Sequence, residues 1–218
     1  MKIKHLFLIL LFTSGVSQLF AQKIPFAEEI HAFKHQDSLS MPKPGGLLFI
    51  GSSSIRKWED LSQRFAGKPI IQRGVGGSEL WQWVKYYAPD LIYPYQAKKI
   101  FIYVGENDIN GGRSAQTVYD DFVTLYGMIK KHSSKSQIIF MSIKESPSRA
   151  KTYGTVMQTD SLIAGFLKDK KNTRYVDVNS VLFDGAGKPD STLFQNDMLH
   201  LKSAGYDRWQ KAIEKYVK

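Results

Sequence analysis

The sequence contains no cysteine. This absence excludes disulfide bonds, a thiol nucleophile, thiolate metal ligands and a lipid-modified cysteine, so a packed core must stabilise the protein unaided. A long hydrophobic run is also missing, because the unbroken apolar stretch from Leu6 to Phe12 is far shorter than the roughly 20 residues that span a bilayer. Stable insertion into a membrane is therefore not expected.

The first residues have the order of a secretory signal. Lys2 and Lys4 precede the apolar stretch, and small or polar residues follow it up to Ala21. This arrangement predicts a signal peptide over residues 1–21, with the mature chain beginning at Gln22. We therefore expect an exported protein, periplasmic or secreted.

Acidic residues are few beside basic ones: 20 Asp and Glu against 30 Lys and Arg, a net charge of +10. The basic residues are scattered, with small clusters at 130–136 and 168–172 that are typical of solvated helix ends. No recognised nucleic-acid module or basic stripe interleaved with aromatics accompanies the charge, so nucleic-acid binding is not expected. The positive net charge is compatible with attraction to anionic glycans or to a lipid surface.

Short apolar runs alternate with longer amphipathic stretches, and 43% of the 218 residues are apolar. We predict one domain over residues 22–218 and a lead-in helix within 22–44. The predicted strands are 47–50, 69–73, 98–104, 137–143 and 173–178. The predicted helices are 54–65, 78–95 with interruptions at Pro89 and Pro94, 114–132, 152–170 and 203–217. This alternation indicates an α/β fold, a three-layer sandwich of a five-stranded parallel sheet with helices on both faces.

Four polar loops follow the strands or precede the last helix. They read "GSSSI" (51–55), "GVGGSE" (74–79), "GENDING" (105–111) and "QNDMLHLKSAGY" (195–206). Loops after parallel strands share one edge of the sheet, where open α/β sheets bind ligands. Together they offer a hydroxyl, a histidine three residues after an aspartate, a glycine amide and an asparagine. A hydroxyl nucleophile needs these parts: a base, a group that fixes the base's tautomer, and donors for an oxyanion.

The blocks "FIGSSSIRKW", "QRGVGGSE", "YVGENDI" and "DMLH" occur in this order. They resemble those of the SGNH or GDSL-type esterases and acylhydrolases, a flavodoxin-like α/β family, over about residues 45–210. The resemblance implies a hydrolase of carboxylic esters with a Ser-His-Asp triad, no cofactor and no metal. By position it implies that Ser53 is the nucleophile, His200 the base and Asp197 its partner. The implied oxyanion donors are the backbone amides of Ser53 and Gly77 and the side chain of Asn107.

This sequence departs from the family pattern in two places. The usual G-D-S reads Gly51-Ser52-Ser53, so the aspartate before the nucleophile is missing. We expect Ser54 to cap the helix that follows while Ser53 attacks. Gln72 stands where many members carry asparagine, a change that we interpret as having no consequence for the reaction.

Residues 79–96 hold two tryptophans and four tyrosines. Such aromatics can line a site for sugar rings or acyl chains. The favoured interpretation is that Trp81, Trp83 and Tyr87 pack helices against the sheet, and that Trp58 also lies in the core.

Family members act on acetylated carbohydrates, lysophospholipids and simple esters. Export without a lipid anchor favours a small-molecule or glycan ester, and deacetylation of carbohydrates is the first hypothesis. The alternatives are a lysophospholipase-like or short-chain lipid esterase, an O-acyltransferase, and a non-catalytic glycan-binding domain on the same fold. The sequence does not indicate an oligomeric state.

Overall fold

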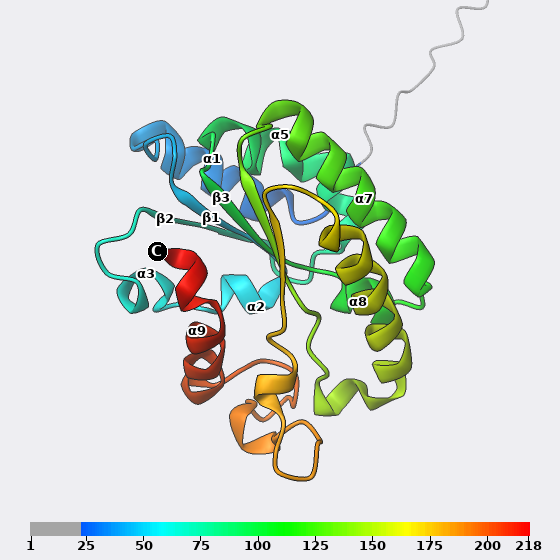
Figure 1. Ribbon diagram of the computed structural model, residues 1–218. Helices are drawn as coiled ribbons and strands as arrows, with labels where there is room; N and C mark the ends of the chain where they lie inside the picture. The colour runs from blue at the N-terminus through cyan, green and yellow to red at the C-terminus, as the bar shows by residue number, and fades with distance from the viewer. Residues whose placement is uncertain (1–22) are drawn as a thin grey trace, which may run out of the picture.

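Five parallel strands form one sheet in the computed structural model, which describes residues 23–218 (Figure 1). The strands are β1 (Leu47–Gly51), β2 (Ile70–Gly74), β3 (Lys99–Tyr103), β4 (Gln137–Met141) and β5 (Thr173–Val176). Their order is β2-β1-β3-β4-β5, and every neighbouring pair is parallel. The predicted α/β fold and all five predicted strands are confirmed.

The predicted signal peptide at residues 1–21 lies outside the described residues and stays a prediction. Within residues 23–218, no helix has the length and apolar character that crossing a membrane requires.

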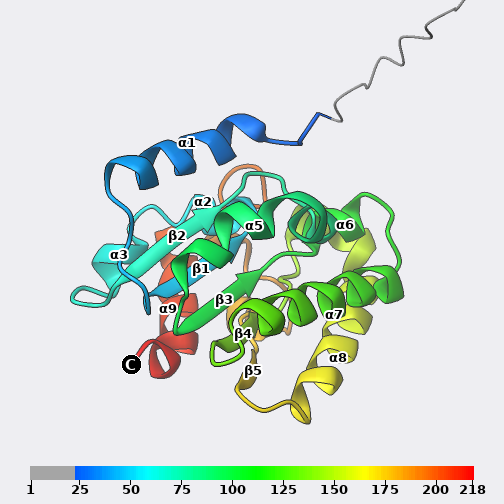
Figure 2. The ribbon, with the colours of Figure 1, turned by 90° about the horizontal axis from the view of Figure 1, so that it is seen from above.

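Helices cover both faces of the sheet because the strands are apolar on both sides (Figures 1 and 2). In β1, Leu48 and Ile50 belong to one buried cluster, and Leu47 and Phe49 belong to the other. A strand buried on both faces reads as a continuous apolar run, which is the pattern of β1. The first cluster packs on α1 (Ala27–Leu39), α7 (Ala115–His132) and α8 (Tyr153–Lys168), and the second packs on α9 (Ser203–Val217).

The lead-in helix and the long helices were predicted within a few residues of their observed bounds, but the helix predicted over 54–65 is wrong. Two short helices occupy it, α2 (Ser53–Arg56) and α3 (Leu61–Arg64). The side-chain amide of Gln72 donates to the carbonyls of Ile55 (2.5 Å) and Trp58 (3.0 Å). Since these carbonyls are bonded to a neighbouring strand, the chain turns away from a continuous helix.

The helix predicted over 78–95 is also interrupted more than expected. It divides into α4 (Leu80–Gln82), a π-helical turn η1 (Trp83–Tyr87), α5 (Ala88–Leu91) and a 3-10 turn η2 (Tyr93–Tyr95). Pro89 lies in the first turn of α5 and Pro94 in the first turn of η2, where the missing N–H of proline costs no hydrogen bond. The remaining short turns are α6 (Glu106–Asn110), η3 (Pro147–Thr152), η4 (Ser180–Leu182) and η5 (Ser191–Leu193).

The aromatic side chains of residues 79–96 serve mainly as core. Trp83 and Tyr87 are fully buried, as is Trp58 on the other face of the sheet, so the core interpretation is confirmed for these three. Trp81 is only half-buried, and its indole nitrogen donates to Glu79 Oε2 at 2.6 Å.

Helix α1 lies along β2 at the edge of the sheet (Figure 2). Arg73 of β2 joins the two elements: its guanidinium donates to Asp37 of α1 and, at 2.6 Å, to the hydroxyl of Tyr95. The same guanidinium lies 5.0 Å from the ring centre of Phe33, also on α1. Side chains of α1 therefore hold this helix against the edge strand β2.

Candidate active site

Ser53, His200 and Asp197 meet at the carboxyl end of the sheet. Ser53 is the first residue of α2 and the second residue after β1, and His200 lies 147 residues later, just before α9. His200 Nε2 is 2.9 Å from Ser53 Oγ, and His200 Nδ1 is 2.6 Å from Asp197 Oδ2. The Asp197 carboxylate can only accept a hydrogen bond, so Nδ1 carries the hydrogen and the lone pair of Nε2 faces the serine hydroxyl.

The loop that carries His200 is fixed by its own aspartate. Asp197 Oδ1 accepts hydrogen bonds from the backbone amides of Leu199 and His200, both at 3.0 Å. Met198 completes this tight turn in a left-handed conformation with φ 53°. Partial burial raises the pKa of Asp197, but the hydrogen bonds from the His200 ring and from the two amides outweigh it and lower the pKa well below its usual value. The carboxylate therefore stays charged beside the imidazole.

The three serines of the run have different surroundings. Ser52 is the N-cap of α2 and makes no side-chain capping bond, while Ser54 is buried inside the helix. The expectation that Ser54 caps the helix is therefore wrong, because the helix begins one residue earlier, at Ser53.

Gly51 has φ 147°, and a Cβ there would lie 1.8 Å from the carbonyl oxygen of Tyr103. Only glycine allows β1 to turn this closely into the serine run.

The three predicted oxyanion donors lie on neighbouring loops. Gly77 adopts φ 75° in the loop after β2. Within residues 23–218, the backbone amides of Ser53 and Gly77 donate to no protein acceptor. Asn107 lies on α6, and its side-chain N–H donates a hydrogen bond to Ser78 O at 3.0 Å. An amide group has two N–H bonds, so one stays available to a substrate oxygen.

Asp108, after β3, accepts hydrogen bonds from the segment that follows β2. Its carboxyl is completely buried, and both of its oxygens accept from the amide of Leu80, at 3.0 and 2.9 Å. Burial raises the pKa of Asp108 to about 7. This residue was not predicted from the sequence, although it follows Asn107 directly within the quoted "GENDI" block.

We expect Asp108→Asn to change how stability depends on pH. The folded-state pKa is about 7 against 3.8 for a free carboxyl, so the unfolded chain ionises first as pH rises. Burial of Asp108 therefore costs more free energy as pH rises from about 4 to 7, on the order of 4 kcal/mol in total. Asparagine does not ionise, so its burial has no such pH-dependent cost. Urea unfolding from pH 4 to 8.5 should show the variant gaining stability relative to wild type up to about pH 7, with no further gain above it. A difference in the free energy of unfolding that does not change with pH would contradict the raised pKa of Asp108.

A buried polar cluster lies behind Asn107, built by Tyr103, Glu106, Lys144 and Ser146. Glu106 Oε2 accepts from Lys144 Nζ at 2.5 Å and from the Tyr103 hydroxyl at 2.9 Å. Glu106 Oε1 accepts from Ser146 Oγ at 2.5 Å. Burial alone would raise the pKa of Glu106, but the charges of Lys144 and Arg149 bring it below its usual value.

Sequence reasoning missed this cluster. The signal that could have found it is "KES" (144–146), a charged run placed directly after a predicted strand at the functional edge.

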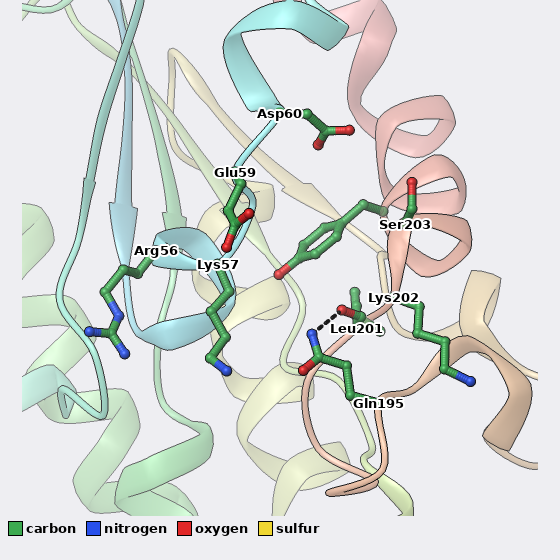
Figure 3. Close-up of a pocket in the computed structure, with 9 residues that line it drawn as sticks. Arg56, Lys57, Glu59, Asp60, Gln195, Leu201, Lys202 and Ser203 are labelled. Carbon is green, nitrogen blue, oxygen red and sulfur yellow. Dashed lines mark hydrogen bonds between the residues drawn. The ribbon is translucent and has the colours of Figure 1, made fainter.

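A hollow of about 770 Å³ opens between α2 and the start of α9 (Figure 3). Its lining includes Lys57, the residue after α2, and Gln195 and Lys202, which lie on either side of His200 in the chain. The Gln195 amide donates to Leu201 O at 3.0 Å, the bond drawn in Figure 3. Most of the residues that line the hollow carry hydrogen-bonding side chains, and Ser53, Asp197 and His200 are not among them. Among residues 23–218, no group of three or more His, Asp or Glu side chains has the arrangement of a metal site.

The sequence matches the model of the GDSL-like lipase/acylhydrolase family over residues 48–208. No curated protein matches the sequence.

Solved structures share the fold. A Streptococcus pneumoniae protein named as a platelet activating factor has a TM-score of 0.79 at 21% identity, with 88% of this chain and 92% of that chain covered. A GDSL-like lipase from Bacteroides thetaiotaomicron has a TM-score of 0.72 at 18% identity, with 88% and 98% covered. A catalytic variant of an acetylxylan esterase from Geobacillus stearothermophilus has a TM-score of 0.64 at 15% identity, with 81% and 96% covered.

Proposed function

The chain belongs to the GDSL-like lipase/acylhydrolase family of ester-bond hydrolases, and we propose that it is an exported serine esterase that removes acetyl groups from carbohydrates. The observation that carries the proposal is the chain of two hydrogen bonds from Ser53 Oγ through His200 to Asp197, at 2.9 and 2.6 Å. A base within hydrogen-bond reach of a hydroxyl, itself oriented by a carboxylate, is the arrangement that activates a serine.

In the first step, Ser53 Oγ forms a bond to the ester carbonyl carbon while its proton passes to His200 Nε2. The carbonyl π electrons move to the carbonyl oxygen, which becomes the oxyanion of a tetrahedral intermediate. Asp197 stabilises the imidazolium that forms and holds it in place. The backbone amides of Ser53 and Gly77 and the free N–H of Asn107 donate to the oxyanion, where preorganised donors have their largest effect.

In the second step, the intermediate collapses and the bond to the leaving alcohol breaks. His200 Nε2–H gives its proton to the alcohol oxygen, and the acyl group stays on Ser53. Water then takes the place of Ser53: it attacks the acyl carbon while His200 accepts its proton, and the carboxylic acid leaves as Ser53 recovers its hydrogen. The cycle consumes one water for each ester and needs no cofactor.

The polar hollow supports a hydroxyl-rich alcohol as the leaving group. Lys57, Gln195 and Lys202 offer donors and acceptors of the kind that sugar hydroxyls use, and each lies within a few residues of Ser53, Asp197 or His200 in the chain. An acetylxylan esterase also has this fold. Together with the predicted export, these features favour acetylated glycans over lipids as the substrate class.

A series of p-nitrophenyl esters tests the acyl preference. We expect kcat/KM for acetate to exceed that for octanoate by about tenfold or more. In the proposed acetyl esterase, a longer acyl chain does not gain the roughly 0.8 kcal/mol that each methylene contributes when an apolar channel buries it. Release of acetate from acetylated xylooligosaccharides is the companion measurement. A maximum at eight carbons or more would identify a lipid esterase instead. Acetylated product appearing on an added sugar acceptor would identify an acyltransferase.

A further inference from the structure

Both ends of the Asn107 side-chain amide are bonded, and the two partners differ in kind. Its nitrogen donates to the carbonyl of Ser78 at 3.0 Å, and its oxygen accepts from Arg149 Nη2 at 3.0 Å. A carbonyl can only accept and a guanidinium can only donate. A rotation of the amide by 180° would set like groups against each other at both ends, so these partners fix which end faces the oxyanion.

Arg149 is well placed to keep this contact. It lies on η3, and only 14% of its side chain is exposed. Its Nη1 is 3.7 Å from Glu106 Oε1, the carboxylate of the buried cluster and the residue directly before Asn107. The backbone of Arg149 is also held at both ends, because its amide donates to Ser146 O at 2.8 Å and its carbonyl accepts from Thr152 Oγ1 at 2.8 Å.

The charge of Arg149 adds to the geometry. A hydrogen bond from a cation to the Asn107 carbonyl oxygen polarises the amide and makes its N–H bonds stronger donors. Because the guanidinium is mostly withdrawn from water, its field is screened less than that of a surface charge. The oxyanion develops only in the transition state, so both effects act on the rate and not on substrate binding.

We propose that Arg149 is a positioning residue of the oxyanion hole, which orients and polarises the Asn107 amide. The proposal rests on the proposed function, and it assigns a role to a residue outside the four sequence blocks of the family resemblance. Arg149 does not touch the substrate in this scheme and acts through Asn107.

The test compares Arg149→Met and Arg149→Lys with Lys151→Met, using p-nitrophenyl acetate. Lys151 is an exposed cation on the same short helix, so its variant controls for the loss of one positive charge from η3. We expect Arg149→Met to lower kcat about tenfold, less than the loss of a whole oxyanion donor, with KM within about twofold. Arg149→Lys should recover part of the rate, and Lys151→Met should match wild type.

The decisive measurement adds Arg149→Met to an Asn107→Ala background. If Arg149 acts through Asn107, the second substitution changes kcat by less than about twofold there. A full tenfold loss in that background, or an unchanged kcat in Arg149→Met alone, overturns the proposal. Thermal unfolding of each variant separates misfolding from a catalytic effect, and the Arg149→Lys comparison decides the case if the methionine variant does not fold. A wild-type protein without esterase activity would instead refute the proposed function.

Discussion

Ser53→Ala is expected to lower kcat/KM for p-nitrophenyl acetate by about 10⁴- to 10⁶-fold, the range found when the nucleophile of a catalytic triad is removed. The reason is that alanine leaves no oxygen to carry the acyl group, so only the oxyanion donors act on a direct attack by water. The folded state should be little affected, since Ser53 begins a helix and its side-chain oxygen bonds to the part-buried His200 ring. Initial rates on matched preparations, checked by circular dichroism, measure the change.

The neighbouring hydroxyls supply the control. Ser52→Ala and Ser54→Ala remove buried serines that lie on either side of Ser53 and are not bonded to His200. Both variants should keep activity within a few-fold of wild type. A fluorophosphonate probe followed by peptide mass spectrometry should label Ser53 in wild type and in both controls. Labelling of another serine would reassign the nucleophile, and no labelling together with no esterase activity would favour a glycan-binding domain.

The convergence of Ser53 and His200 could be predicted because it follows from topology. Their loops are 147 residues apart, yet one follows a central parallel strand and the other precedes the last helix. The rule that such loops share one edge of the sheet brings them together without any knowledge of side-chain packing. The central strands β1, β3 and β4 were equally predictable, because strands buried on both faces are nearly unbroken apolar runs.

The break between α2 and α3 could not be predicted in this way. It depends on Gln72, a residue of β2 whose amide bonds to Ile55 and Trp58 on another element. The same holds for Arg149: nothing in the sequence "SPSRAK" indicates that its guanidinium reaches Asn107, 42 residues away. Local patterns report periodicity and turns, whereas these contacts depend on the three-dimensional packing that the fold creates.

Asn107→Ala is expected to lower kcat by about 10²- to 10³-fold with little change in KM, the cost of removing one donor from an oxyanion hole. The amide N–H that Ser78 does not use meets its acceptor only once the carbonyl oxygen has become an oxyanion, so the substrate's ground state loses little. Asn110→Ala is the matched control, because Asn110 is an exposed residue with the same side chain on the same helix. Its kcat should equal that of wild type.

Asn107→Asp sharpens the test, because it keeps the shape of the side chain and reverses its chemistry. An aspartate still accepts from Arg149, but the oxygen that replaces the amide nitrogen has no hydrogen for Ser78 O or for the oxyanion. It also places a negative charge where negative charge develops in the transition state. We therefore expect a loss in kcat at least as large as that of Asn107→Ala, about 10²-fold or more. A variant that retained more than a tenth of wild-type kcat would mean that Asn107 is not a donor, and stabilisation would then have to come from the amides of Ser53 and Gly77 alone.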